Sequence, residues 1–303
     1  MKFSVIFIVS SKCREVYMKC MGSFALNCMD EYDVFLLDDG TCNPAILAEY
    51  AKLFKSPAVC YTNNQQEELV YSILKRFPNC LEFWGKHILA RKLLVPALVG
   101  GEDIVFIDAD IFFITKFSLK NAIQAVGNGY AFMFDTSDYA RTLIWPHTWI
   151  FRFFWPQLKF VRRANTGIII FKKTSWNAQF IEHILGRRYY KWHCKKLIGS
   201  IFYWMCEQTL YAMLAARGRA YYINPKQCRL ANEGFTSDTT LNYTALHFVT
   251  GTRNLISKCA EISAKNENRE HVVNIELIDA QLQPIAAPAW EEIKLGIRQL
   301  IRS

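Results

Sequence analysis

Two aspartates two positions apart, Asp108 and Asp110, lie within the most strand-like run of the sequence, DIVFIDADIFF at 103–113. Two carboxylates so placed can both approach one hard divalent cation, which keeps coordination positions open for diphosphate oxygens. The apolar residues on both sides make unpaired acids costly at this point of the chain. The pattern therefore predicts a metal-binding turn where a buried strand ends.

A second chemistry uses the same two aspartates. Haloacid-dehalogenase-like phosphatases carry an hhhhDxDx[TV] motif, in which the first Asp is a nucleophile. That motif normally lies near the start of the chain, whereas this pair follows a long series of strand and helix patterns. A phosphatase is therefore a minor alternative to metal binding.

The elements that must position these acids alternate regularly. Apolar runs rich in β-branched and aromatic residues are separated by segments of helical periodicity. We expect strands at 3–9, 33–40, 58–61, 103–113, 164–173, 220–223 and 245–249. We expect helices around 13–28, 44–54, 83–98, 177–217 and 289–301. This alternation indicates an α/β fold with a mainly parallel, Rossmann-like sheet flanked by helices.

Polar residues follow three of the expected strands. Ser10 and Ser11 come after the first strand, two acids at 38–39 end the second, and the acids at 108–110 belong to the fourth. In sheets of this kind, ligands bind outside the carboxyl ends of the strands. We therefore expect the three polar groups to converge on one binding site.

Composition limits the partners and the compartment. The 303 residues include 36 basic and 27 acidic side chains, and the resulting net charge of +9 favours nucleotides, anionic lipid surfaces or nucleic acid. The bases are scattered and no nucleic-acid reader motif is present, so we do not expect nucleic acid as a partner. The ten cysteines form no C-x-x-C pair, which argues against structural zinc and favours reduced thiols in the cytoplasm.

The segment 131–164 differs from the rest in character. It interleaves Trp145, Trp149 and Trp155 with arginine and lysine. Such a mixture is typical of peripheral contact with a membrane face or of an acceptor-binding insertion. It equally fits an aromatic packing layer with a basic rim. No apolar run reaches the ~18 residues of a transmembrane helix, so any membrane contact is expected to be peripheral.

Seven motifs together resemble a known group of enzymes. In chain order they are IFIVSS, DVFLLDDGT, ILARKLLVPAL, VFIDADIFF, ANTGIIIF, EQTLYAML and LHFVTG. This order resembles nucleotide-sugar glycosyltransferases of the GT-A fold, most nearly glycosyltransferase family 8, over roughly residues 3–253. The resemblance implies a mainly parallel sheet flanked by helices, with a smaller acceptor-side part.

The resemblance also implies one GT-A domain over 1–303. Residues 1–130 would form its nucleotide-sugar-binding half and 165–260 its acceptor and catalytic half. The aromatic and basic insertion at 131–164 lies between them, and 261–303 is a tail with a closing helix.

The metal site follows from the same resemblance. Asp108, Asp110 and a downstream histidine, His247, match the residues that bind Mn²⁺ (or Mg²⁺) in the family. Such a metal neutralises the leaving nucleoside diphosphate. Gly251 and Arg253 follow the histidine, where Arg253 could clamp a phosphate oxygen. Without the resemblance, His247 would be read as a packed structural histidine.

Donor contacts are implied at several further positions. Ser10, Ser11 and Asp39 would contact the base and ribose, and Lys86 and Arg91 precede the metal motif on an expected helix. Apart from the resemblance, both bases would be ordinary helix-surface residues. The remaining donor-binding positions are Ala109 inside the metal motif and Asn165, Thr166 and Gly167 at the start of a strand. Glycine there allows a close backbone approach.

Glu207 and Gln208 resemble the family's Asp-Gln pair at the reacting face. An acid or amide beneath the anomeric carbon can attack it or stabilise an oxocarbenium-like state. An exposed helix acid is the plainer interpretation of Glu207.

These assignments predict a metal-dependent glycosyltransferase. It would move a hexose from a nucleotide diphosphate sugar, UDP-linked, to a hydroxyl of a glycan or glycolipid, with retention. A catalytically inactive nucleotide-sugar-binding module is the alternative from another class. A nucleotidyltransferase of the same fold is disfavoured, because SSKCREVY lacks the glycine-rich loop that holds a triphosphate.

Overall fold

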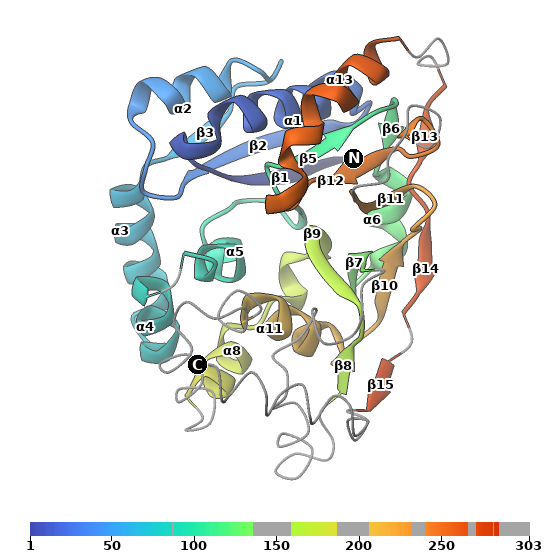
Figure 1. Ribbon diagram of the computed structural model, residues 1–303. Coiled ribbons are helices and arrows are strands. Elements are labelled where there is room, and N and C mark those ends of the chain that lie inside the picture. The colour runs from blue at the N-terminus through green and yellow to red at the C-terminus, as the bar shows by residue number, and fades with distance from the viewer. Residues whose placement is uncertain are drawn as a thin grey trace, which may run out of the picture.

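An eight-stranded sheet forms the centre of the computed structural model, which describes residues 1–86, 88–135, 159–186, 206–231, 240–265, 271–280 and 282–284. From one edge to the other its strands are β14 (Leu277–Asp279), β10 (Ala220–Ile223), β7 (Tyr130–Phe134), β9 (Ala164–Lys172), β4 (Asp103–Ile107), β1 (Lys2–Val9), β2 (Glu31–Asp38) and β3 (Val59–Tyr61). Figure 1 shows helices on both faces of this sheet.

Most strands of the sheet share one direction. The pairs β1–β2, β2–β3, β1–β4 and β7–β10 are parallel. Two strands run the other way: β9 is antiparallel to both β4 and β7, and β14 is antiparallel to β10. The expected mainly parallel sheet is confirmed, with one consequence for the site. Because β9 is reversed, its first residues lie beside the carboxyl end of β4.

Nine α-helices and four 3₁₀-helices lie in the described ranges. The α-helices are α1 (Arg14–Asn27), α2 (Pro44–Ala51), α3 (Asn63–Leu74), α4 (Pro78–Lys86), α5 (Ala90–Leu94), α6 (Lys120–Val126), α8 (Ala178–Leu185), α11 (Cys206–Ala215) and α13 (Ile256–Ala264). The 3₁₀-helices are η1 (Ser11–Cys13), η2 (Val95–Ala97), η4 (Lys173–Ser175) and η5 (Thr250–Leu255).

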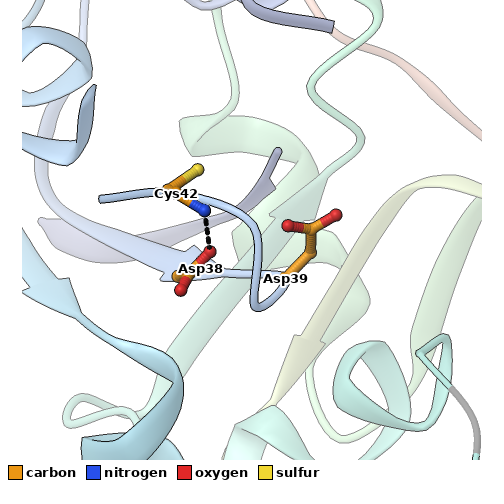
Figure 2. Close-up of side chains that lie close together, drawn as sticks. All are labelled: Asp38, Asp39 and Cys42. Carbon is orange, nitrogen blue, oxygen red and sulfur yellow. Dashed lines mark hydrogen bonds between the residues drawn. The ribbon is translucent and has the colours of Figure 1, made fainter. Parts of the chain in front are cut away.

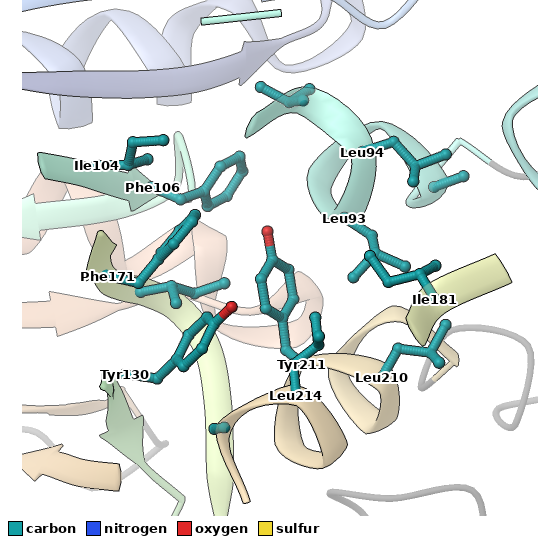
Figure 3. Packing of buried hydrophobic residues seen from close by; sticks show 14 of the residues in the cluster. Leu93, Leu94, Ile104, Phe106, Tyr130, Phe171, Ile181, Leu210, Tyr211 and Leu214 are labelled. Carbon is teal, nitrogen blue, oxygen red and sulfur yellow. The ribbon is translucent and has the colours of Figure 1, made fainter. Parts of the chain in front are cut away.

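Alternate side chains of the central strands supply two hydrophobic cores. Val5 and Val105 pack with the buried faces of α1, α2 and α6. Ile6 and Phe106 pack on the other face with α4, α5, α8 and α11. This alternation is the two-residue period of a strand covered on both faces. In the second core, Tyr211 of α11 projects between the sheet and α5 (Figure 3), and its hydroxyl donates to the main-chain oxygen of Lys92 at 2.8 Å.

Three smaller sheets complete the described strands. One joins β11 (Cys228–Leu230), β12 (Ala245–His247) and β5 (Ile111–Phe113), the second pairs β13 (Val273–Asn274) with β6 (Phe117–Ser118), and the third pairs β15 (Leu282–Pro284) with β8 (Lys159–Val161). The first of these matters for the site, because β5 begins directly after the two aspartates and runs antiparallel to β12.

The single strand expected at 103–113 is wrong. The chain turns at 108–110, where the Ile111 amide donates to the Asp108 carbonyl at 3.1 Å, and β5 leaves the central sheet. The continuous helix expected at 83–98 is also wrong, because separate helices α4 and α5 are followed by η2. Pro96 lies in η2 and has no amide to continue an α-helix.

Helix α3 is absent from the expectations drawn above. Its start carries a sequence signal: Thr62 and Gln65 form a reciprocal capping box. Its buried residues Gln66, Val70 and Leu74 repeat every four positions. The exposed apolar residues Leu69, Tyr71 and Ile73 between them hide this period.

Several expectations lie outside the described residues. They include the aromatic middle of 131–164, much of 177–217 and the closing helix at 289–301. The division of the chain into two halves and a tail stays a prediction. Among the helices that the structure describes, none is long and apolar enough to cross a membrane. The nine cysteines within these ranges are free thiols.

Candidate active site

A cavity of about 670 Å³ opens where β1, β2 and β4 end and β9 begins. Most of the residues proposed from sequence meet there. The lining includes Ser10, Asp39, Asp108, Ala109, Asp110, Asn165, Thr166, Gly167, Glu207, Gln208, His247 and Arg253. The polar ends of strands that are distant in sequence therefore do converge.

Three candidate metal ligands form one group in the wall of this cavity. Nε2 of His247 lies 3.2 Å from Oδ1 of Asp110 and 3.6 Å from Oδ2 of Asp108. The turn after β4 carries both acids, and the pairing of β12 with β5 places His247 opposite Ile111. A further hydrogen bond, from the Phe248 amide to the Asp110 carbonyl at 3.0 Å, fixes the end of β12 against the turn.

This group fits a divalent cation. One ligand atom from each residue lies within 4.8 Å of the others. Adjacent ligands of a six-coordinate ion with bonds of ~2.1 Å are separated by ~3 Å, close to the two separations that involve His247. Two carboxylates and one imidazole suit Mn²⁺ and neighbouring divalent metals.

Two basic side chains also face the carboxylates. Nζ of Lys92 lies 2.8 and 3.0 Å from the oxygens of Asp108 and 3.5 Å from Oε1 of Glu207. Nη2 of Arg253 lies 2.6 Å from Oδ2 of Asp110. Lys92 is deeply buried, with 5% of its side chain exposed. Three carboxylates thus face two fixed cations, and when all three are ionised one negative charge is left for a further cation.

The surroundings shift the pKa values of Asp108, Asp110 and Glu207 in different directions. Burial opposes the ionisation of Asp110, but the hydrogen bond and charge of His247, together with Arg253, outweigh it and lower its pKa to about 2. Burial raises the pKa of Asp108 despite Lys92 and His247. It also raises the pKa of Glu207, although Lys92 and Thr166 favour the ionised form.

The first turn of α11 brings Glu207 and Gln208 into the same cavity, where Glu207 and Asp108 both contact Lys92. The hydroxyl of Thr166 donates to Oε1 of Glu207 at 2.7 Å, and the Thr166 amide donates to Oε1 of Gln208 at 3.2 Å. Both side chains are buried. An acid is favoured in the first turn of a helix by the helix dipole. The exposed-helix interpretation of Glu207 is therefore wrong.

Solved structures with a similar fold are glycosyltransferases. Mouse xyloside xylosyltransferase 1 matches with a TM-score of 0.53 at 9% identity, over 83% of this chain and 99% of that one. The bifunctional glycosyltransferase WbbM matches with 0.53 at 11% identity, over 89% of this chain and 50% of that one. GlyE of Streptococcus pneumoniae matches with a TM-score of 0.52 at 11% identity, over 88% of this chain and 61% of that one.

This chain has the GT-A glycosyltransferase fold. The fold class predicted from the sequence is confirmed. No protein-family model and no curated protein matches the sequence, so the resemblance to family 8 stays a prediction.

In the same cavity of this GT-A fold, the residues that follow β1 and β2 form a hydrogen-bonded group. The hydroxyl of Thr41 donates to Oδ1 of Asp39 at 2.5 Å and lies 3.1 Å from Oγ of Ser10. The Ser11 amide also donates to Thr41 Oγ1, at 3.0 Å. Ser10 and Asp39 line the cavity and Ser11 does not.

Three further residues expected at the donor do not line the cavity. Arg91 is buried behind it, where its guanidinium donates to the Asp38 carbonyl at 2.6 Å and to Gln66 and Asn63. Lys86 is exposed and pairs with Glu82 at 2.5 Å. Gly251 lies in η5 with no neighbour close to where a Cβ would project.

Lys92 is the main residue that the sequence reasoning missed. It follows Arg91 directly, and the phase of α5 turns Lys92 toward the acids and Arg91 away from them. A signal was available, because a lysine among buried leucines requires a carboxylate partner. Tyr17, Thr41 and Cys13 also line the cavity and carried no signal of their own.

Proposed function

We propose that this chain is a metal-dependent glycosyltransferase. It transfers a hexose from a nucleotide diphosphate sugar, UDP-linked, to a hydroxyl of a glycan or lipid-linked acceptor, with retention of configuration. The observation that carries the proposal is that Asp108, Asp110 and His247 form one group and line the same cavity as Glu207 and Gln208.

Asp108, Asp110 and His247 would hold Mn²⁺ or Mg²⁺, which neutralises the diphosphate leaving group when bound. Arg253 is already at this end of the cavity, where its guanidinium can exchange Asp110 for a phosphate oxygen. Lys92 lies between Asp108 and Glu207, and its single positive charge offsets part of the negative charge of the two acids while the donor binds.

The reacting face of the sugar would rest on Glu207 and Gln208. The Thr166 hydroxyl orients the Glu207 carboxylate, and the Lys92 ammonium favours its ionised form. An ionised acid beneath the anomeric carbon either attacks it or stabilises the positive charge that develops there. A phosphatase is disfavoured, because the chain has the GT-A fold and the two aspartates follow more than 100 residues of strands and helices, whereas the phosphatase motif lies near the start of the chain.

Calorimetric titration of UDP, with GDP as comparison, tests the proposal in the presence and absence of Mn²⁺. We expect UDP binding that requires the metal and that Asp110→Ala weakens at least ~100-fold, since the metal loses a charged ligand. Asp33→Ala removes an exposed aspartate at the far end of β2 and is the matched control.

Metal-independent binding, or equal binding by Asp110→Ala, would contradict the proposed donor site. Release of UDP from UDP-hexoses then separates an enzyme from an inactive binding module, which would bind the donor without turnover.

A further inference from the structure

The first residues of β9 lie directly behind the metal-ligand group. The Asp108 amide donates to the Gly167 carbonyl at 2.7 Å, which fixes this strand end against the turn that carries both aspartates. Asn165 lies two residues earlier and is nearly buried, with 8% exposed. The resemblance implies that Asn165 and Gly167 contact the donor sugar, whereas in the structure both residues lie against the ring of His247.

The contacts of Asn165 determine which nitrogen of His247 carries a proton. The Gly167 amide donates to Oδ1 of Asn165 at 2.8 Å, so this side-chain atom is the carbonyl oxygen. The same oxygen lies 3.2 Å from Nδ1 of His247. An oxygen can only accept, so Nδ1 is the donor in this contact.

The other nitrogen of the ring is then free to bind a cation. A neutral imidazole with its proton on Nδ1 has its lone pair on Nε2. Nε2 is the atom that lies 3.2 Å from Asp110 and 3.6 Å from Asp108. Asn165 thus selects the tautomer that a metal shared with the two aspartates requires.

The lack of a side chain at Gly167 leaves space for the imidazole ring of His247. A Cβ at this position would lie 2.5 Å from Nδ1 of His247 and 2.8 Å from Oδ1 of Asn165. Both distances are shorter than carbon can approach nitrogen or oxygen without a shift, and His247 is itself buried at 5% exposure. Any larger residue would therefore displace the imidazole from the aspartates.

We propose that Asn165 and Gly167 are positioning residues for the third metal ligand. Asn165 fixes the tautomer and ring orientation of His247, and Gly167 provides the space for that ring. The inference rests on the proposed function and deepens it. Nδ2 of Asn165 has no hydrogen-bond partner within the described ranges, so the amide can serve His247 and the donor sugar at once.

The first test measures Mn²⁺ binding in the presence of UDP without any sugar, from the free-ion EPR signal. Asn165→Leu removes the acceptor and keeps the branching of the side chain, and we expect it to weaken Mn²⁺ binding ~10–100-fold, as is usual for partners of ligating histidines. Asn165→Asp keeps an acceptor and should retain the affinity within ~3-fold. Gly167→Ala should resemble Asn165→Leu, and the exposed Asn128→Leu is the control.

The second test reads the tautomer directly from ¹⁵N NMR of the six histidines, with His247→Gln to assign the signal. In metal-free protein, at alkaline pH where the spectrum no longer changes, we expect a protonated Nδ1 and a bare Nε2. In Asn165→Leu we expect a mixture of both tautomers.

A wild-type His247 protonated on Nε2 would overturn the inference. So would an Asn165→Leu protein that binds Mn²⁺ and UDP normally and loses only affinity for the UDP-sugar, because Asn165 would then be a sugar contact alone. If the wild-type protein binds no Mn²⁺ with any nucleotide, the proposed function fails. The NMR measurement still decides whether Asn165 sets the tautomer.

Discussion

Two groups of potential metal ligands lie at the ends of β2 and β4, the two parallel strands on either side of β1, and they differ in what holds their oxygens. Asp38, Asp39 and Cys42 gather after β2, and Asp108, Asp110 and His247 gather after β4. In the first group, Oδ1 of Asp38 accepts from three successive backbone amides, those of residues 40, 41 and 42, at 2.8–3.0 Å. Figure 2 shows the bond to Cys42 and the carboxylate of Asp39 pointing away from it.

In the second group, the oxygens face charged side chains. Lys92 and Arg253 each contact one aspartate, and the imidazole lies between the two acids. The first arrangement is a turn stabilised by its own backbone. The second is a cluster of carboxylates whose negative charges are offset by basic side chains. Acid spacing alone does not separate a turn from a metal site, whereas the partners of each oxygen do.

The largest expected effect comes from removing a cation of the second group. Lys92→Met leaves Asp108 and Glu207 without their common counter-charge, and breaking a buried pair costs about 3–5 kcal/mol of unfolding free energy at pH 7. Urea unfolding measures it. Lys86→Met, which breaks an exposed pair, is the control and should stay within about 0.5 kcal/mol of wild type.

The loss should be smaller at pH 5. The folded-state pKa values of Asp108 and Glu207 lie above the ordinary range, so the folded protein binds more protons than the unfolded chain and its stability falls as the pH rises through them. Without Lys92 this dependence becomes steeper. A loss equal at both pH values would contradict the charge-balance interpretation.

An intermediate effect is expected in the first group. Asp38→Ala removes the acceptor of three backbone amides from a buried site and should cost about 1–3 kcal/mol of unfolding free energy. Asp38→Asn keeps a carbonyl oxygen and should cost less. In both variants we expect Mn²⁺ affinity at saturating UDP to stay within ~2-fold of wild type, because the proposed metal ligands are elsewhere. A large loss of Mn²⁺ affinity would assign Asp38 to the metal.

The smallest effect concerns Arg253. The pKa of Asp110 is lowered to about 2, so its ionised form adds stability above the unfolded-chain value of ~3.9, and this stability is lost as the pH falls toward 2. Arg253→Gln removes one cause of the lowering. We expect acid unfolding to begin at higher pH and roughly 1 kcal/mol less stability at pH 7. An unchanged acid transition would show that His247 alone sustains the ionised Asp110.

Much of the fold follows from local sequence patterns. The central residues of β1, β2 and β4 form continuous apolar runs, as strands buried on both faces must. The direction of β9 could not be predicted in this way, because ANTGIIIFKK is equally apolar in either orientation. Helix α3 was not predicted because its buried face is narrow: only three of its residues are buried.

The residues of the site also differ in how far the sequence alone predicts them. The pair Asp108 and Asp110 is visible in one short segment, because an apolar strand ends in two acids. The partners of these acids come from distant segments. His247 was found only through resemblance, and choosing Lys92 over Arg91 depends on the phase of a five-residue helix, which a short pattern does not define.

The sequence separation of the contacting residues has a consequence for folding. The contact between Arg253 and Asp110 closes 143 positions of chain, and the contact between Arg253 and Cys13 closes 240. Contacts of such long range form late, after shorter loops have closed. The cavity therefore exists only when nearly the whole chain is folded. Any compound that binds there should slow global unfolding and protect strands far from the site against hydrogen exchange.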